Sequence, residues 1–132
     1  MQAIQTVGII GAGTMGNGIA QACATCGINV VMVDISQAAV DKGLATVSSS
    51  LDRLIKKEKI TADDKAAALA GITVATDYAA LAGAQLVIEA ATENEELKIK
   101  ILQQLDAMLP KETLIASNDR VRLALAWPVG VS

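Results

Sequence analysis

Three glycines and one aspartate are spaced so that they could hold a diphosphate and a ribose. Gly11, Gly13 and Gly16 form a G-x-G-x-x-G loop between an apolar run and a helix-forming segment. In such a loop the first glycine makes a tight turn, the second admits a phosphate to bare backbone, and the third lets the helix pack on the strand. The unpaired N–H groups of the helix N-terminus then hold the anion without a basic side chain.

Asp34 ends a second apolar run, residues 29–33, at the distance from Gly11 typical of a ribose-binding acid. Its carboxylate can accept hydrogen bonds from the adenosine ribose hydroxyls, and its charge would repel a 2′-phosphate. The pattern therefore favours NAD over NADP. Two alternatives remain, because a lone glycine motif can be an ordinary turn and Asp34 can be a helix cap. Ser36 is placed to cap that helix instead.

Apolar runs and amphipathic stretches alternate along the chain and must position these motifs. Strands are expected near 6–10, 29–33, 72–74, 85–90 and 113–117, with helices at 14–26, from 37 into the fifties, at 62–69 and from about 92 to 108. The last helix is predicted from the stripe Leu97, Ile101, Leu105 and Met108. Strands alternating with helices predict an α/β fold, a Rossmann-type doubly wound parallel sheet.

The carboxyl ends of parallel strands meet at one edge of the sheet, where ligands bind. Four segments are expected there: the glycine loop with Thr14 and Met15, then Asp34, the loop that begins at Ala90, and Ser117-Asn118. One cofactor could touch all four.

Length and composition exclude several classes of protein. The 132 residues, 52% hydrophobic and 19% charged, suit one globular domain. The net charge of −3 invites neither nucleic acid nor an anionic membrane surface. No apolar run is long enough to span a membrane, and the N-terminus lacks the layout of a signal peptide, so a cytoplasmic protein is expected.

Cys23 and Cys26 form a C-x-x-C pair, which can indicate a redox or metal site. They fall near the end of the first helix, where the helix dipole opposes a thiolate, so we interpret them as small apolar helix residues. The chain has no second cysteine pair and no histidine, so no metal site is predicted, and a histidine-based triad within these residues is excluded.

Two further segments have open interpretations. Basic residues gather at the end of the long helix, where they either complement the helix C-terminus or contact an acidic ligand; they are Arg53, Lys56, Lys57 and Lys59. Residues 119–132 hold the only tryptophan and have no clear period. They could form an extra strand stopped by Pro128 or an irregular tail.

In order along the chain, five motifs resemble those of the 3-hydroxyacyl-CoA dehydrogenase family, and within it the NAD-binding domain of bacterial 3-hydroxybutyryl-CoA dehydrogenases. The resemblance covers residues 1–118. The motifs are Val7 to Gln21, Val33-Asp34, Ser50 to Leu54, Glu89 to Asn94, and Ile115 to Asn118.

The resemblance implies roles for particular residues. Gly11, Gly13, Met15 and Gly16 would surround the NAD pyrophosphate, and Asp34 would bind the adenosine ribose. It also implies that Glu93 and Lys98 lie near the nicotinamide ribose, and that Ser50 and Lys57 contact the CoA part of an acyl-CoA substrate. The complete set of cofactor-binding candidates is Gly11, Gly13, Thr14, Met15, Gly16, Asp34, Ala90, Glu93, Lys98 and Asn118.

The sequence departs from the family after Asn118. Arg120 stands where the family has a substrate-contacting serine, and the family's catalytic histidine, its glutamate partner and its helical domain have no counterpart here. We therefore expect an NAD-binding domain at 1–118, a divergent tail at 119–132, no catalytic residue in this chain, and self-association through uncovered apolar surface. A non-catalytic NAD-binding module and another NAD-dependent hydroxyacid dehydrogenase are the alternatives.

Overall fold

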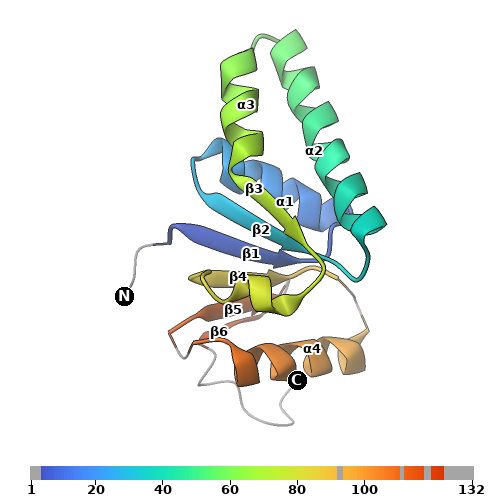
Figure 1. Ribbon diagram of the computed structural model, residues 1–132, viewed down its shortest axis with the longest axis vertical. Helices are drawn as coiled ribbons and strands as arrows, with labels where there is room; N and C mark the ends of the chain where they lie inside the picture. Colours follow the sequence, from blue (N-terminus) through green and yellow to red (C-terminus); the bar gives the residue numbers. More distant parts are fainter. Residues whose placement is uncertain (1–3, 92–93, 111, 118–119, 124–132) are drawn as a thin grey trace.

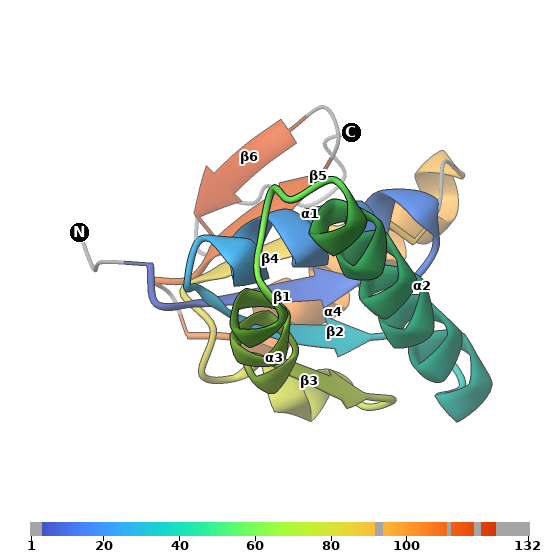
Figure 2. The same ribbon diagram turned by 90° about the horizontal axis from the view of Figure 1, so that it is seen from above.

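The computed structural model describes residues 4–91, 94–110, 112–117 and 120–123. A single sheet forms the middle layer, with α1, α2 and α3 on one face and α4 on the other (Figure 1). The view from above shows α1 and α2 lying across one face and α4 behind the sheet (Figure 2). The α/β layers predicted from the alternating pattern are confirmed.

The elements follow one another in the predicted order. They are β1 (Thr6–Ile10), α1 (Thr14–Thr25), β2 (Asn29–Val33), α2 (Gln37–Lys56), α3 (Ala62–Ala70), β3 (Ile72–Ala75), the 3-10 helix η1 (Tyr78–Leu81), β4 (Leu86–Glu89), α4 (Glu95–Met108), β5 (Leu114–Ser117) and β6 (Arg120–Leu123).

The strand order is β3-β2-β1-β4-β5-β6, and the first five strands are parallel. In this register Ile10 at the end of β1 lies beside Val33 of β2 and Glu89 of β4. The glycine loop, Asp34 and the segment after β4 therefore leave the sheet at the same edge.

The sixth strand resolves part of the open interpretation of the C-terminal segment. β6 is an extra strand, and it runs antiparallel to β5, with Ser117 opposite Arg120. Only residues 118 and 119 separate the two strands. A connection that short joins antiparallel neighbours, whereas a parallel pair needs a long crossover. Residues 124–132 lie outside the described part of the chain.

Short polar side chains begin the helices as expected. The Ser36 hydroxyl accepts a hydrogen bond from the Ala39 N–H at the start of α2, so the predicted cap is confirmed. Thr61 and Asp64 form a reciprocal capping box at the start of α3. Asp77 begins η1 by accepting a hydrogen bond from the Ala79 N–H.

The apolar residues form one cluster on each face of the sheet. The cluster under α1 and α2 includes Ile9, Met32, Val47 and Leu51, and the cluster under α4 includes Leu81, Leu102, Leu105 and Ile115.

The predicted stripe of α4 was wrong at both ends. Leu97 and Met108 are 48% and 45% exposed, whereas Leu102 and Leu109 are buried. The buried positions are 98, 101, 102 and 105 of the helix and Leu109 just after its end, while Leu97 and Met108 border a cavity beside the helix. An i, i+4 apolar spacing does not distinguish these neighbouring faces.

Candidate dinucleotide site

The glycine loop has the geometry its three glycines predict. Gly11 has a φ of +104°, a conformation that favours glycine, and a Cβ there would lie 2.7 Å from Ala91 Cα. A Cβ on Gly16 would lie 1.8 Å from the Gly11 carbonyl oxygen, so α1 packs directly on the loop. The tight turn and the close packing are therefore confirmed.

Gly13 is the open position of the loop. A Cβ on Gly13 would meet no atom within 4 Å, and Gly13 precedes α1 without a side-chain cap for the helix. The first N–H groups of a helix that lacks such a cap can bind an anion. Thr14 and Met15 form the first turn of α1, and both are exposed. These residues fit a pyrophosphate, and their contacts with it stay a prediction.

Asp34 lies directly against the glycine loop. One carboxylate oxygen accepts a hydrogen bond from the Ala12 N–H over 2.8 Å, and the other accepts from the Ile35 N–H over 2.7 Å. The carboxylate is thereby held at the end of β2, next to the turn. It is not the cap of α2, because Ser36 has that role.

The segment after β4 completes this edge of the sheet. The Ala90 N–H donates to the Ile10 carbonyl over 2.7 Å, and the Ala91 N–H donates to a carboxylate oxygen of Glu89 over 2.7 Å. Asn94 caps α4 by accepting from the Leu97 N–H. Ala90 is thus held beside the glycine loop as predicted from topology. Glu93 and Asn118 lie outside the described residues.

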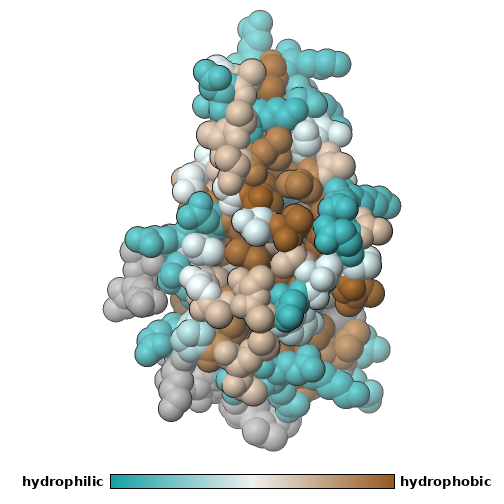
Figure 3. Space-filling view, in the orientation of Figure 1, coloured by the Kyte–Doolittle hydropathy of each residue, from teal (hydrophilic) through white to brown (hydrophobic). Residues whose placement is uncertain are grey.

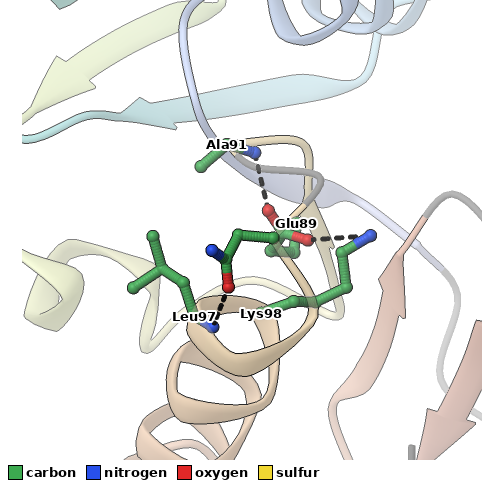
Figure 4. Close-up of polar contacts among 5 residues, drawn as sticks. Glu89, Ala91, Leu97 and Lys98 are labelled. Atoms are coloured by element: carbon green, nitrogen blue, oxygen red, sulfur yellow. Dashed lines mark hydrogen bonds and ion pairs between the residues drawn. The ribbon is translucent and has the colours of Figure 1, made fainter.

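Lys98 is buried, with 4% of its surface exposed. Figure 4 shows its side chain extending from α4 toward Glu89, and the Lys98 Nζ lies 3.7 Å from a Glu89 carboxylate oxygen. The candidate for the nicotinamide ribose is therefore held from inside the fold, at the end of β4.

A cavity of about 1100 Å³ opens beside Asp34, between η1 and α4. Its walls include Asp34, Ile35, Tyr78, Ala91 and Leu97. Burial raises the pKa of the Tyr78 phenol, and the charges of Glu89 and then Asp34 raise it further. The mostly apolar walls, with Tyr78 half-buried among them, fit a flat base attached to a ribose at Asp34.

Sequence reasoning missed Tyr78 and Leu97 as wall residues. Neither carries a motif, and they reach the cavity from different elements, η1 and α4. The weak signal available was the only tyrosine of the chain, one residue after the Asp77 helix start.

Ser50 and Lys57, the candidates for a CoA contact, lie on α2 and at its C-terminal end. Ser50 is half-buried and Lys57 is exposed. A separation of seven residues places them on one side of a helix, about 10 Å apart along its axis. They are not among the residues that line the cavity.

The hairpin of α2 and α3 projects beyond the sheet (Figure 1). Figure 3 shows hydrophilic side chains at its tip and hydrophobic ones lower down, where the two helices meet the rest of the molecule. Arg53 and Lys56 lie in the last turn of α2, and an ion pair of 2.6 Å joins Lys65 of α3 to Asp52 of α2.

The two cysteines are free thiols, one half-buried and one exposed. Burial, and then the neighbouring Cys26, raise the pKa of the Cys23 thiol, which opposes a reactive thiolate. Among the described residues no group of three or more histidine, cysteine or acidic side chains could hold a metal ion. No helix of the described ranges is long and apolar enough to cross a membrane.

Comparison with known proteins points to one family. The model of the 3-hydroxyacyl-CoA dehydrogenase NAD-binding domain matches residues 6–120. The 3-hydroxybutyryl-CoA dehydrogenase of Bradyrhizobium diazoefficiens is 44% identical over 115 residues, which cover 87% of this chain and 39% of the relative. The 3-hydroxyadipyl-CoA dehydrogenase of Escherichia coli is 39% identical, over 87% of this chain and 24% of the relative.

A solved structure gives the same result. The (S)-3-hydroxybutyryl-CoA dehydrogenase of Ralstonia eutropha superposes with a TM-score of 0.86 at 66% sequence identity, covering 87% of this chain and 41% of that one. The chain therefore spans about two fifths or less of the length of these relatives.

Proposed function

This chain belongs to the family of 3-hydroxyacyl-CoA dehydrogenase NAD-binding domains, and on that premise we propose that it is the cofactor half of an enzyme that transfers hydride between NAD(H) and short 3-hydroxyacyl-CoA and 3-oxoacyl-CoA. The observation that carries the proposal is the meeting of the open Gly13, the Asp34 carboxylate and the β4–α4 segment at one edge of the sheet.

Each part of the site would hold one part of the cofactor. The N–H groups at the start of α1 would bind the pyrophosphate, and Asp34 the adenosine ribose, with the adenine in the cavity beside Tyr78. Ala90, Glu93, Lys98 and Asn118 would contact the nicotinamide end. When bound, NAD⁺ would supply the hydride acceptor for oxidation and NADH the hydride donor for reduction, while these residues bind and orient the cofactor.

The basic end of α2 supports an acyl-CoA substrate. Arg53, Lys56 and Lys57 bring three positive charges to the last turn and the end of one helix, with Ser50 on the same helix. Lysines there can bind the phosphates of CoA. The same positive charges would also stabilise the C-terminal end of α2 by complementing the helix dipole.

A non-catalytic NAD-binding module is the second candidate for the isolated chain. It is favoured by one observation, namely that these 132 residues contain no histidine, the residue to which the family resemblance assigns proton transfer. A third candidate, another NAD-dependent hydroxyacid dehydrogenase, requires no contact between Ser50 or Lys57 and a CoA thioester. Titration with acetoacetyl-CoA, on the native chain and on Lys57→Ala, separates it from the first.

The proposal is tested by titrating the chain with NADH and NADPH and following the fluorescence of the reduced nicotinamide. NADH should bind at least tenfold more tightly, because Asp34 would face the additional phosphate of NADPH. Equal affinities would remove Asp34 from the ribose site.

Location and association are also part of the proposal. A cytoplasmic location would keep both cysteines as the free thiols that the structure contains. Self-association would cover apolar side chains that the fold leaves exposed, among them Ile35, Leu97 and Met108. Light scattering at increasing protein concentration should show a rising mean mass, and a constant monomer mass would contradict it.

A further inference from the structure

Glu89 is a buried acid at the carboxyl end of a central strand of the sheet. It ends β4, pairs with Ile10 in the register, and is 1% exposed. A carboxylate is costly to bury unless it is paired and hydrogen-bonded. The strand pattern alone explains the apolar residues of β4, but it does not explain a charge at this position.

Two contacts use the two oxygens of this carboxylate. One oxygen accepts the Ala91 N–H over 2.7 Å, and the other lies 3.7 Å from the Lys98 Nζ. Figure 4 shows the Ala91 N–H and the Lys98 amine approaching Glu89 from different sides. Glu89 thus joins the end of β4, the segment that follows it, and the first turn of α4.

The position of Ala91 matters for the glycine loop. Ala91 and Ala90 occupy the space where a Cβ on Gly11 would lie, at distances of 2.7 and 2.8 Å. The Ala90 N–H is bonded to Ile10, the residue before Gly11. Any shift of this segment would therefore displace the turn at Gly11, which faces the proposed pyrophosphate site.

We propose that Glu89 is a positioning residue of the dinucleotide site, which acts by holding the Lys98 amine and the Ala91 backbone in place for the nicotinamide ribose. This inference rests on the proposed contact of Lys98 with that ribose. An ammonium group has three N–H donors, so an ion pair with Glu89 does not prevent Lys98 from donating to a ribose hydroxyl. The burial of both partners strengthens their attraction, because the local dielectric is low.

The test separates the two ends of the cofactor. Affinities for NADH, which contains the nicotinamide ribose, and for ADP, which does not, are measured by calorimetry for the native chain and for Glu89→Gln, Lys98→Met and the double variant. Glu89→Gln can still accept the Ala91 N–H but loses the charge. We expect Glu89→Gln and Lys98→Met each to lower the affinity for NADH about tenfold and the affinity for ADP less than twofold. The double variant should bind NADH no more weakly than either single variant.

Glu96→Gln is the matched control, because Glu96 is an exposed acid in the same turn of α4. It should change neither affinity. If Glu89→Gln does not fold, as judged by circular dichroism, Glu89→Asp decides. It keeps the charge but shortens its reach by one methylene, and the same selective loss of NADH affinity is expected.

Three results would overturn the inference, and they are distinguishable. If Lys98→Met binds NADH as tightly as the native chain, Lys98 does not contact the ribose, and the inference about Glu89 fails as well. A loss in Lys98→Met but none in Glu89→Gln or Glu89→Asp would leave that contact standing and dismiss Glu89. Equal losses for NADH and ADP in the Glu89 variants would show a purely structural residue.

Discussion

Asp34 accepts a hydrogen bond from the backbone N–H of Ala12 over 2.8 Å, so the acid at the end of β2 is tied to the glycine loop at the end of β1. The two groups are far apart in sequence and adjacent because β1 and β2 pair in register. Asp34 therefore has two functions to separate, one in shaping the loop and one in choosing the cofactor.

Asp34→Asn should separate them. The asparagine carbonyl can still accept the Ala12 N–H, although the exposed Ile35 N–H loses its acceptor. The negative charge that would repel a 2′-phosphate is gone. We expect the preference for NADH over NADPH to narrow by about tenfold, equivalent to about 1.4 kcal/mol. Fluorescence titration of both nucleotides measures it.

Asp63→Asn is the control for this charge change, since Asp63 is exposed in the first turn of α3. It should leave the preference untouched. A preference unchanged in Asp34→Asn would show that Asp34 only supports the loop.

Gly13 and Gly16 form a matched pair for a second prediction. Alanine at Gly16 would place its Cβ 1.8 Å from the Gly11 carbonyl oxygen, whereas at Gly13, where φ is −71°, it would meet nothing within 4 Å. Gly16→Ala should lower the Tm by roughly 10 °C, from about 2–3 kcal/mol of overpacking.

Gly13→Ala should keep the Tm within a few degrees of the native value and lower the affinity for NADH at least tenfold. The added methyl group would occupy the space through which the pyrophosphate approaches the backbone. Gly18→Ala is the control, because a Cβ on Gly18, within α1, would also meet nothing within 4 Å. It should lower neither the Tm nor the affinity for NADH. Thermal melting and NADH titration of the three variants decide the matter. Tight NADH binding by a folded Gly13→Ala would contradict the assigned approach.

Most of the fold could be predicted because it is encoded locally. Continuous apolar runs and period-3.6 apolar stripes, with Ser36 and Thr61 at helix starts, define the elements from β1 to β5. Two features could not be predicted this way. The buried face of α4 depends on how the helix rotates against the sheet, and the antiparallel β6 depends on pairing with β5.

The residues of the candidate site likewise fall into those that a local motif predicts and those that only tertiary packing brings together. Gly11, Gly13, Gly16 and Asp34 carry a motif, so their positions were predictable from spacing. Tyr78 reaches the site only through the crossover from β3 to β4, a tertiary relationship. Buried Glu89 was hidden in an apolar strand, and its ion pair with α4 is visible only once the helix is placed.

Tyr78 offers a third prediction, on pH. Burial first, and then the charges of Glu89 and Asp34, raise the pKa of its phenol above the ordinary value of about 10. The folded state holds the phenol proton more tightly than the unfolded state does. The contribution of the protonated Tyr78 to the stability of the folded state is therefore fully present below pH 10 and is lost as the pH rises through the raised pKa. The phenolate absorbance near 295 nm reports this group alone, since Tyr78 is the only tyrosine.

Asp34→Asn should bring the Tyr78 pKa part of the way back toward the ordinary value, because it removes the smallest of the three contributions. Asp63→Asn again serves as the control. A phenol that titrates at or below the value for free tyrosine would contradict the placement of Tyr78 in the cavity wall.

The last prediction concerns activity: the purified chain should bind NADH and yet show no reduction of acetoacetyl-CoA above background. Reduction of the 3-keto group needs a proton donor beside the carbonyl, and a positioned general acid contributes about 10²–10⁴-fold in rate. These 132 residues contain no histidine, and Arg120 cannot serve as the acid, because a guanidinium stays protonated. NADH absorbance at near-neutral pH follows the reaction. Turnover that survives rigorous removal of host enzymes would require another acid, with Lys98 and Glu93 the first to be substituted.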